Sequence, residues 1–171
     1  MKEQINQKAE YQYIIAIDPD VTKSGVAELN TQHRLLEVTS LTFPQLLDYL
    51  QYRKKLSETA KTSLIVIVEA GWLNAKSNFH GQSGNKAQRI AKNVGANHQT
   101  GKHIVEYCRH IGIEVVEQRP LAKTWRGRDK KITHDELAYF TGITGKTNQE
   151  ERDAALLAWH YAGLPIKVKA K

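Results

Sequence analysis

The stretch "YIIAIDPDVTKSGVAELN", residues 13–30, places a run of strand-forming residues directly before an acidic turn. Its first five residues, Tyr13–Ile17, are β-formers and predict a strand that ends abruptly at Asp18-Pro19-Asp20. An ionised carboxylate at the end of a buried strand costs free energy unless something compensates its charge. Turn chemistry explains an aspartate here, since Asp and Pro are ordinary turn residues, and catalysis explains it equally well. The residues that accompany Asp18 in the fold decide between these two interpretations.

The rest of the chain alternates strand and helix patterns without a linker or a repeat. Short connections between the first three strands predict an antiparallel meander. The nearly continuous apolar run "SLIVIVE" is typical of a strand buried on both faces, as in a parallel sheet covered by helices. The predicted elements are strands at Tyr13–Ile17, Gly25–Leu29, Leu35–Ser40, Ser63–Glu69 and Ile113–Gln118, and helices from Pro44, from Ala87 to Ile111, from Thr133 to about Gly142 and from Gln149 to Ala162. This order predicts an α/β fold whose mixed sheet is an antiparallel meander followed by parallel strands.

The longest predicted helix carries apolar residues at spacings of three and four from Ala87 to Ile111. Gly95 and Gly101 within this pattern predict close packing against another element. Cys108, the single cysteine, excludes an intramolecular disulfide and a cysteine-based zinc site. Because it falls at an apolar helical position, we expect a small buried side chain rather than a nucleophile.

Length and composition predict one globular domain over residues 1–171, with flexible ends at 1–11 and 166–171. The chain is long enough for a hydrophobic core, and 40% of its residues are hydrophobic, with a mean hydropathy of -0.53. No apolar run approaches the length needed to span a membrane, so no membrane partner is expected. The first ten residues lack the apolar core of a signal peptide, which predicts a cytoplasmic protein.

A net charge of +7 and a pI of about 9.4 favour a polyanionic partner. The segment "KTWRGRDKK", residues 123–131, concentrates five basic side chains around Trp125. Phosphates attract such a cluster, and an aromatic ring within it can stack on a base. A solvated loop is the alternative, and this segment alone favours neither.

Acidic residues end two of the most apolar predicted strands, at Asp18 and Glu69. Neighbouring parallel strands would bring both carboxylates to one edge of the sheet, where α/β folds place ligands. There they would repel each other unless one stays protonated or a cation lies between them. Glu150 and Asp153 share one face of the last helix. Stabilisation of the helix N-terminus is the alternative for both acids, and it fits Asp153 less well because that residue lies inside the first turns. Three or four carboxylates predict a hard-cation site that suits Mg²⁺ or Mn²⁺, and two such ions can hydrolyse a phosphodiester.

Four histidines are further candidates for the site: His80, His98, His134 and His160. The helical spacing predicts that His98 and His160 point inward, although His160 lies two turns beyond Asp153. A buried, hydrogen-bonded histidine without a catalytic role is the commoner outcome at such positions.

The segments "IIAIDPD…SGVAEL", "LIVIVEAGW", "NVGANHQTGKHIVEYCRHIGIEVVEQRPLAKTW" and "ERDAALLAWH" resemble, in their order and spacing, the RuvC-type Holliday-junction resolvases. These belong to the RNase H-like, or retroviral-integrase-like, nuclease superfamily. The resemblance runs from about Tyr13 to Leu164. It implies a five-stranded mixed sheet flanked by helices, and a homodimer that cuts two symmetric strands of branched DNA in recombination and repair.

The resemblance also implies roles for individual residues. Asp18, Glu69 and Asp153 are the implied metal ligands, and Glu150 stands where the family often has another aspartate. Lys123 is the implied lysine near the scissile phosphate, with Lys130 and Lys131 as further candidates. The expected nucleic-acid contacts are Trp72, which the resemblance identifies as a wedge at the junction centre, Lys76, Lys86, Arg89, Lys123, Trp125, Arg126, Arg128, Lys130 and Lys131.

The sequence departs from the family pattern at two places. The usual Asp-Pro-Gly is Asp18-Pro19-Asp20 here, and Asp20 is interpreted as a turn former rather than a metal ligand. The loop after Glu69 is longer and more polar than in bacterial housekeeping members.

The prediction is therefore a structure-selective endonuclease that resolves four-way DNA junctions with two Mg²⁺ per active site, with Mn²⁺ as a substitute and without a small-molecule cofactor. An RNA-processing nuclease of the same fold and a catalytically inactive DNA-binding module are the alternatives. Assays on branched DNA and structured RNA in Mg²⁺ separate the three.

Overall fold

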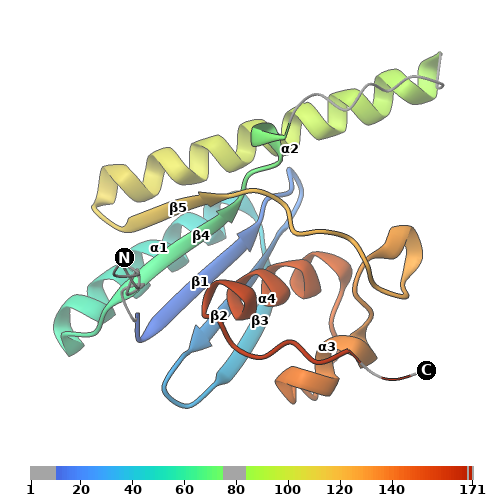
Figure 1. The fold of residues 1–171 in the computed structure, drawn as a ribbon. Coiled ribbons are helices and arrows are strands. Elements are labelled where there is room, and N and C mark those ends of the chain that lie inside the picture. Colours follow the sequence, from blue (N-terminus) through green and yellow to red (C-terminus); the bar gives the residue numbers. More distant parts are fainter. Residues whose placement is uncertain (1–10, 75–83, 169, 171) are drawn as a thin grey trace, which may run out of the picture.

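A five-stranded sheet organises the computed structural model, which describes residues 11–74, 84–168 and 170 (Figure 1). The strands are β1 (Tyr13–Asp18), β2 (Ser24–Asn30), β3 (Leu35–Leu41), β4 (Leu64–Glu69) and β5 (Glu114–Gln118). The helices are α1 (Phe43–Ala60), α2 (Asn85–Ile111), α3 (His134–Thr141) and α4 (Gln149–Tyr161), with short 3₁₀ turns η1 (Gly71–Leu73) and η2 (Arg128–Lys130). Each predicted strand and helix is confirmed, with ends that differ by a few residues except at the end of α1.

The sheet order is β3-β2-β1-β4-β5. β2 pairs antiparallel with β1 and with β3, which confirms the predicted meander. β4 pairs parallel with β1 and with β5, which confirms the parallel half. In this register Asp18 lies opposite Gly25, and Ile17 lies opposite Val68, so the carboxyl ends of β1 and β4 are neighbours. The chain thus has the mixed sheet, flanked by helices, that the RNase H-like resemblance implies.

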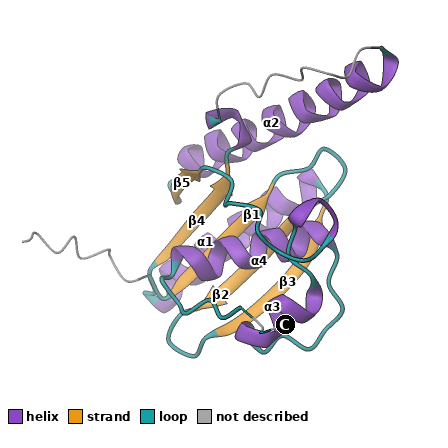
Figure 2. Cartoon of the chain, turned by 45° about the vertical axis from the view of Figure 1, so that its right-hand side comes forward, coloured by secondary structure: helices purple, strands orange, loops and turns teal. Residues whose placement is uncertain are grey.

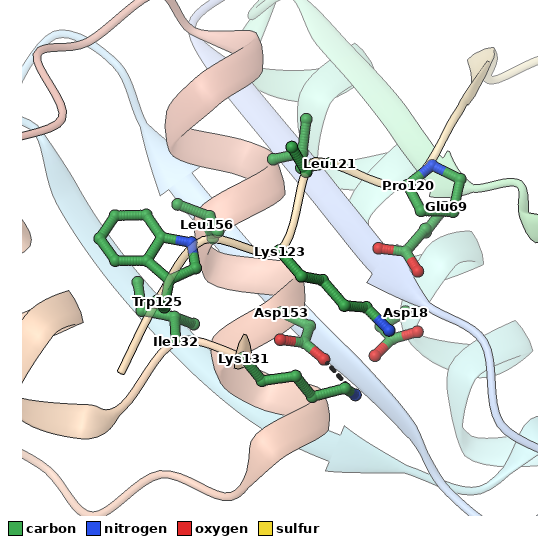
Figure 3. A pocket seen from close by; sticks show the side chains of 11 residues that line it. Asp18, Glu69, Pro120, Leu121, Lys123, Trp125, Lys131, Ile132, Asp153 and Leu156 are labelled. Atoms are coloured by element: carbon green, nitrogen blue, oxygen red, sulfur yellow. Dashed lines mark hydrogen bonds and ion pairs between the residues drawn. The ribbon is translucent and has the colours of Figure 1, made fainter. Parts of the chain in front are cut away.

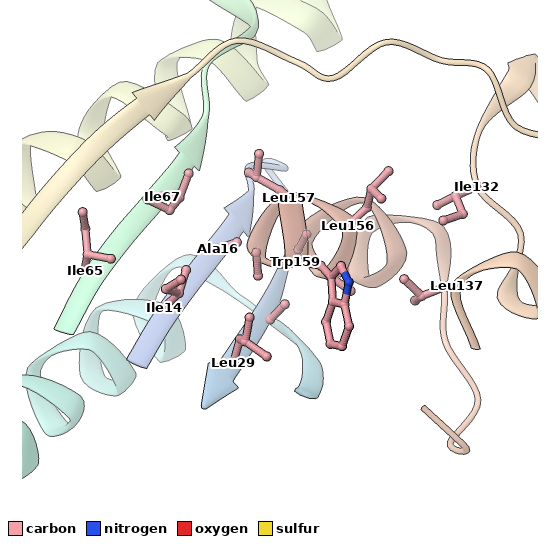
Figure 4. Close-up of a cluster of buried hydrophobic side chains, with 14 residues drawn as sticks. Ile14, Ala16, Leu29, Ile65, Ile67, Ile132, Leu137, Leu156, Leu157 and Trp159 are labelled. Carbon is pink, nitrogen blue, oxygen red and sulfur yellow. The ribbon is translucent and has the colours of Figure 1, made fainter. Parts of the chain in front are cut away.

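Alternating side chains of the central strands pack into two separate cores, one on each face of the sheet. On one face, Ile15 and Ile17 pack with α1 and α2. On the other, Ile14 and Ala16 pack with residues of α3 and α4, among them Leu157, as Figure 4 shows. Because side chains alternate along a strand, the residue after Ile17 points to the second face, toward α4.

The ends of the helices follow the local signals in the sequence. Asn148 and Glu151 form a capping box at the start of α4, and Thr133 and Glu136 form one at the start of α3. Gly112 ends α2 in the left-handed conformation. Together these caps fix where each helix begins and ends, so the acidic residues of α4 fall at defined positions in its first turns.

The first half of α2 corrects the expectation drawn from its apolar pattern. It extends past the edge of the sheet in both Figures 1 and 2, and Val94 is 38% exposed. Among the described residues, a Cβ built on Gly95 meets nothing within 4 Å, so the prediction of close packing there is wrong. At Gly101 the prediction is right, because a Cβ would lie 2.5 Å from Cζ3 of Trp72.

The structure also tests the predictions for the end of α1, the two chain ends and Cys108. α1 continues to Ala60, beyond the basic residues where the pattern faded. Tyr11 and Ile166, both within segments expected to be flexible, pack against the α4-side core. Cys108 is buried, and burial raises the pKa of its thiol to about 12, as expected for a small core side chain. Within the described residues no helix is both long and apolar enough to cross a bilayer.

Candidate active site

Three carboxylates converge where β1 and β4 end beneath α4. Asp18 and Glu69 are the last residues of adjacent parallel strands, and strand alternation points both side chains to the α4 face. Asp153 approaches from α4 itself. All three line one cavity of about 80 Å³, together with Lys123 and Lys131, whose side chains extend toward the carboxylates in Figure 3. The site thus brings together three predicted acids from three elements far apart in the sequence.

Gly25 allows α4 to come this close to the sheet. It is the strand partner of Asp18, and the first turn of α4 lies directly over it. A Cβ on Gly25 would be 2.1 Å from the carbonyl oxygen of Glu150 and 2.8 Å from the backbone nitrogen of Glu151. Backbone atoms of a helix cannot yield as a flexible side chain can. The absence of a side chain at residue 25 therefore sets the approach of Asp153 to Asp18.

The surroundings of Asp18 and Glu69 disfavour the ionised forms of these carboxyl groups. Burial raises the pKa of Asp18 well above its usual range, and the charges of Glu69 and Asp153 raise it further. Burial likewise raises the pKa of Glu69, with Asp153 adding to the effect. Lys131 acts in the opposite direction on both groups. A cation bound at this cavity would relieve the mutual repulsion of the ionised carboxylates.

Lys131 forms the direct ion pair of the site. Its Nζ donates a hydrogen bond of 2.8 Å to Oδ2 of Asp153, shown as a dashed line in Figure 3. Burial lowers the pKa of Lys131, but the hydrogen bond and the charges of Asp153 and Asp18 outweigh it, so the net shift is upward. Lys131 is therefore a protonated cation at neutral pH, held against the acids.

The second oxygen of Asp153 is also held. Gln149 Nε2 donates to Asp153 Oδ1 at 2.8 Å, and Arg152 donates to Gln149 Oε1 at 3.0 Å. Arg152 also donates to the carbonyls of Ile132 (3.0 Å) and Thr147 (2.7 Å). The guanidinium thus ties the segment that carries Lys131 to the start of α4. Gln149 is not among the residues predicted from the sequence. Its position one turn before Asp153, on the same face of α4, could have indicated this contact.

The donor set fits a hard divalent cation in charge and in chemistry, since it consists of buried carboxylate oxygens. Within residues 11–74 and 84–168, however, no group of three or more His, Cys, Asp or Glu side chains is arranged to hold one metal ion. The hydrogen bonds of Asp153 to Lys131 and Gln149 explain the difference, because they direct its oxygens toward those donors. Rotation of side chains within the cavity would have to bring the carboxylates together.

The other acid and the histidines stand farther from the cavity. Glu150 contributes to the raised pKa of Asp18 as the smallest cause, but it does not line the cavity. His160 is exposed, so the inference that it points inward is wrong. His134 pairs with Thr147 Oγ1 at 2.9 Å, and His98 lies beside Trp72. His80 falls outside the described residues.

The predicted nucleic-acid contacts divide into two groups around this site. Lys123 and Lys131 line the cavity, and Lys123 is exposed. Trp125 stacks on Phe140 with ring centroids 6.1 Å apart and is partly buried, so one face of its ring serves packing. The remaining basic residues are all exposed: Lys86 and Arg89 on α2, and Arg126, Arg128 and Lys130 before α3. Lys76 lies outside the described residues.

Trp72 is anchored rather than free. Its Nε1 donates to Glu117 Oε1 at 3.1 Å, and its six-membered ring lies against Gly101. The side chain is half-buried beside Glu69, so a role as a wedge in DNA stays a prediction.

Asp20 is the turn former that the sequence indicated. Its Oδ1 accepts from the backbone nitrogen of Thr22 at 2.7 Å, and its Oδ2 accepts from Asn97 Nδ2 at 3.2 Å. Asn97 Oδ1 in turn accepts from the backbone nitrogen of Val21 at 2.9 Å. The aspartate at this departure from the family pattern therefore fastens the β1–β2 turn to α2.

Comparison with known proteins adds structural neighbours. No family model matches the chain, and no curated protein matches it. Among solved structures it is similar to T. thermophilus RuvC in complex with a Holliday junction substrate, at 16% identity and a TM-score of 0.43, over 90% of this chain and 95% of that one. It is also similar to the Fowlpox virus resolvase in complex with Holliday junction DNA, at 12% identity and a TM-score of 0.36, over 88% of this chain and 97% of that one. The sheet order and strand register of this chain define its fold.

Proposed function

We propose that this protein is a divalent-metal-dependent endonuclease that cuts four-way DNA junctions. The observation that carries the proposal is the meeting of Asp18, Glu69 and Asp153 at one cavity beside two lysines. The motif order that resembles the RuvC-type resolvases supports the junction as substrate, and the exposed basic residues support a polyanionic partner. The alternative of an inactive DNA-binding module is disfavoured because all three acids are present and converge.

In this proposal Asp18, Glu69 and Asp153 hold Mg²⁺, with Glu150 as the candidate fourth ligand and room for two ions per active site. When bound, the metal supplies water activation and stabilises charge on the phosphate oxygens. To hold a metal through Oδ2, Asp153 would share or release the hydrogen bond that it accepts from Lys131. The raised pKa values of Asp18 and Glu69 mean that protons compete with the metal at low pH.

The two lysines complete the chemistry of the site. Lys131 is protonated and hydrogen-bonded to Asp153, and Lys123 lies across the same cavity. Once Asp153 is engaged elsewhere, the ammonium group of Lys131 is available to donate to a phosphate oxygen on which charge develops. Lys123, which lowers the pKa of Glu69 through its charge, is placed to bind the same phosphate group. A homodimer would present two such sites to the two symmetric strands of a junction.

A cleavage assay over several substrates tests the proposal. The protein is incubated in Mg²⁺, Mn²⁺ or Ca²⁺ with a labelled four-way DNA junction, the matching linear duplex and a structured RNA. We expect paired cuts in opposite strands of the junction in Mg²⁺ and Mn²⁺, with the duplex left intact. Cleavage of the RNA alone would establish the RNA-processing alternative. Tight, salt-sensitive junction binding without turnover in any metal would establish the binding module.

A further inference from the structure

A second, larger cavity of about 330 Å³ adjoins the acids on the side of α2. It shares Asp18, Glu69, Lys123 and Lys131 with the first cavity, so the two lie on either side of the same four side chains. A ligand whose phosphate lies at the carboxylates would therefore place its neighbouring group in this second space. Its volume falls within the range typical of small-molecule sites, about 300–1,000 Å³.

The walls of the second cavity combine apolar and aromatic surface with polar and charged side chains. Pro19, Trp72 and Val94 supply apolar and aromatic surface. Trp72 is held in place by its hydrogen bond to Glu117 and by its contact with Gly101, so the indole is ordered before any ligand arrives. Aromatic side chains fixed in this way are the usual platforms for single-stranded bases.

Two polar side chains on these walls, Asn97 and His98, differ in whether they can bind a ligand. Asn97 uses both ends of its amide, donating to Asp20 and accepting from the backbone of Val21. His98 has no hydrogen-bond partner among the described residues, and its ring lies edge-on to Trp72 at 6.1 Å. Burial lowers the pKa of His98, with the charge of Lys102 adding to the effect. A neutral imidazole offers one donor and one acceptor, which suits the edge of a base.

We propose that this cavity receives one unpaired nucleobase next to the scissile phosphate, packed against Trp72 and read at its edge by His98. The proposal rests on the proposed nuclease function and adds a source of sequence preference to it. The target nucleotide leaves the base stack most readily where pairing is already disturbed, as at the centre of a branched junction. His98 is here a specificity residue rather than a catalytic one.

Gly71 provides a way to move His98 without removing it. A Cβ at residue 71 would lie 2.6 Å from His98 Nε2, the far end of that side chain. Gly71→Ala therefore displaces the imidazole at little cost to the fold. His110→Ala is the matched control, because His110 is an exposed histidine on the same helix and does not line the cavity.

The test measures single-turnover cleavage of junctions that differ only in the base on either side of the cut. A single neutral hydrogen bond contributes about 0.5–1.5 kcal/mol, so the wild-type protein should prefer its best base over its worst by about 2- to 13-fold. His98→Ala and Gly71→Ala should both reduce this preference below about twofold, whereas His110→Ala should keep it.

The outcomes separate this inference from the function on which it rests. A wild-type preference that persists in both His98→Ala and Gly71→Ala overturns the inference, as does wild-type cleavage with no base preference. A wild-type protein that cuts no junction overturns the proposed function and the inference together.

Discussion

Replacing Gly25 with alanine should both weaken the fold and disable the site. The new Cβ would lie 2.1 Å from the carbonyl oxygen of Glu150, whereas ordinary contact begins at 3.4 Å. The first turn of α4 must therefore withdraw by about 1 Å, carrying Asp153 away from Asp18. Overpacking of this kind costs typically about 1–3 kcal/mol. For a chain of this length that is a fall in Tm of about 2–12 °C.

The effect of Gly25→Ala on activity should exceed its effect on stability. A displacement of about 1 Å at a reacting centre can cost about 100-fold in rate. The assay is urea unfolding together with single-turnover cleavage in Mg²⁺. Gly95→Ala is the matched control, because its Cβ meets nothing within 4 Å in the part of the chain that the structure describes, and alanine favours a helix by up to about 1 kcal/mol. Unchanged cleavage by Gly25→Ala, with a stability equal to that of Gly95→Ala, would refute the account of how α4 is placed.

Three further predictions concern charge and packing at the site. In EDTA, Asp18→Asn should be more stable than wild type, and the difference should grow as pH rises. The reason is that the raised pKa of Asp18 makes its ionisation cost folding free energy. Urea unfolding at pH 5 and 8 measures this difference. Lys131→Met should shift the acidic limb of the cleavage pH profile to higher pH, since Lys131 lowers the pKa of Asp18 and Glu69, and an unshifted limb would count against this. Gly101→Ala should displace Trp72 and cost about 1–3 kcal/mol in thermal unfolding, which an unchanged Tm would contradict.

The fold and the acids could be predicted because they depend on local signals. The β-formers before Asp18 and Glu69 predict the strands, and alternation along a strand decides on which face the terminal carboxylate falls. Asp153 could be identified because it lies beyond the capping positions of its helix. These inferences need only the order of the elements and the periodicity of side chains.

The remaining features of the site depend on where elements meet in three dimensions. The exposure of His160 follows from the rotation of α4 over the sheet, which spacing alone does not fix. The apolar pattern of α2 already begins at Ala87, yet the first half of the helix lies beyond the edge of the sheet, so the pattern predicted contacts that this half does not make with the described part of the chain. Lys131 was one of several lysines in a basic segment, and only its approach to Asp153 distinguishes it from Lys130.

The most direct test of the central claim is cleavage of a four-way DNA junction by Asp18→Asn in Mg²⁺. The variant keeps the size of the side chain and removes the charge that, with Glu69 and Asp153, defines the site. We expect this variant to bind the junction as tightly as wild type and to show no detectable cleavage. Cleavage at a rate near that of wild type would contradict it.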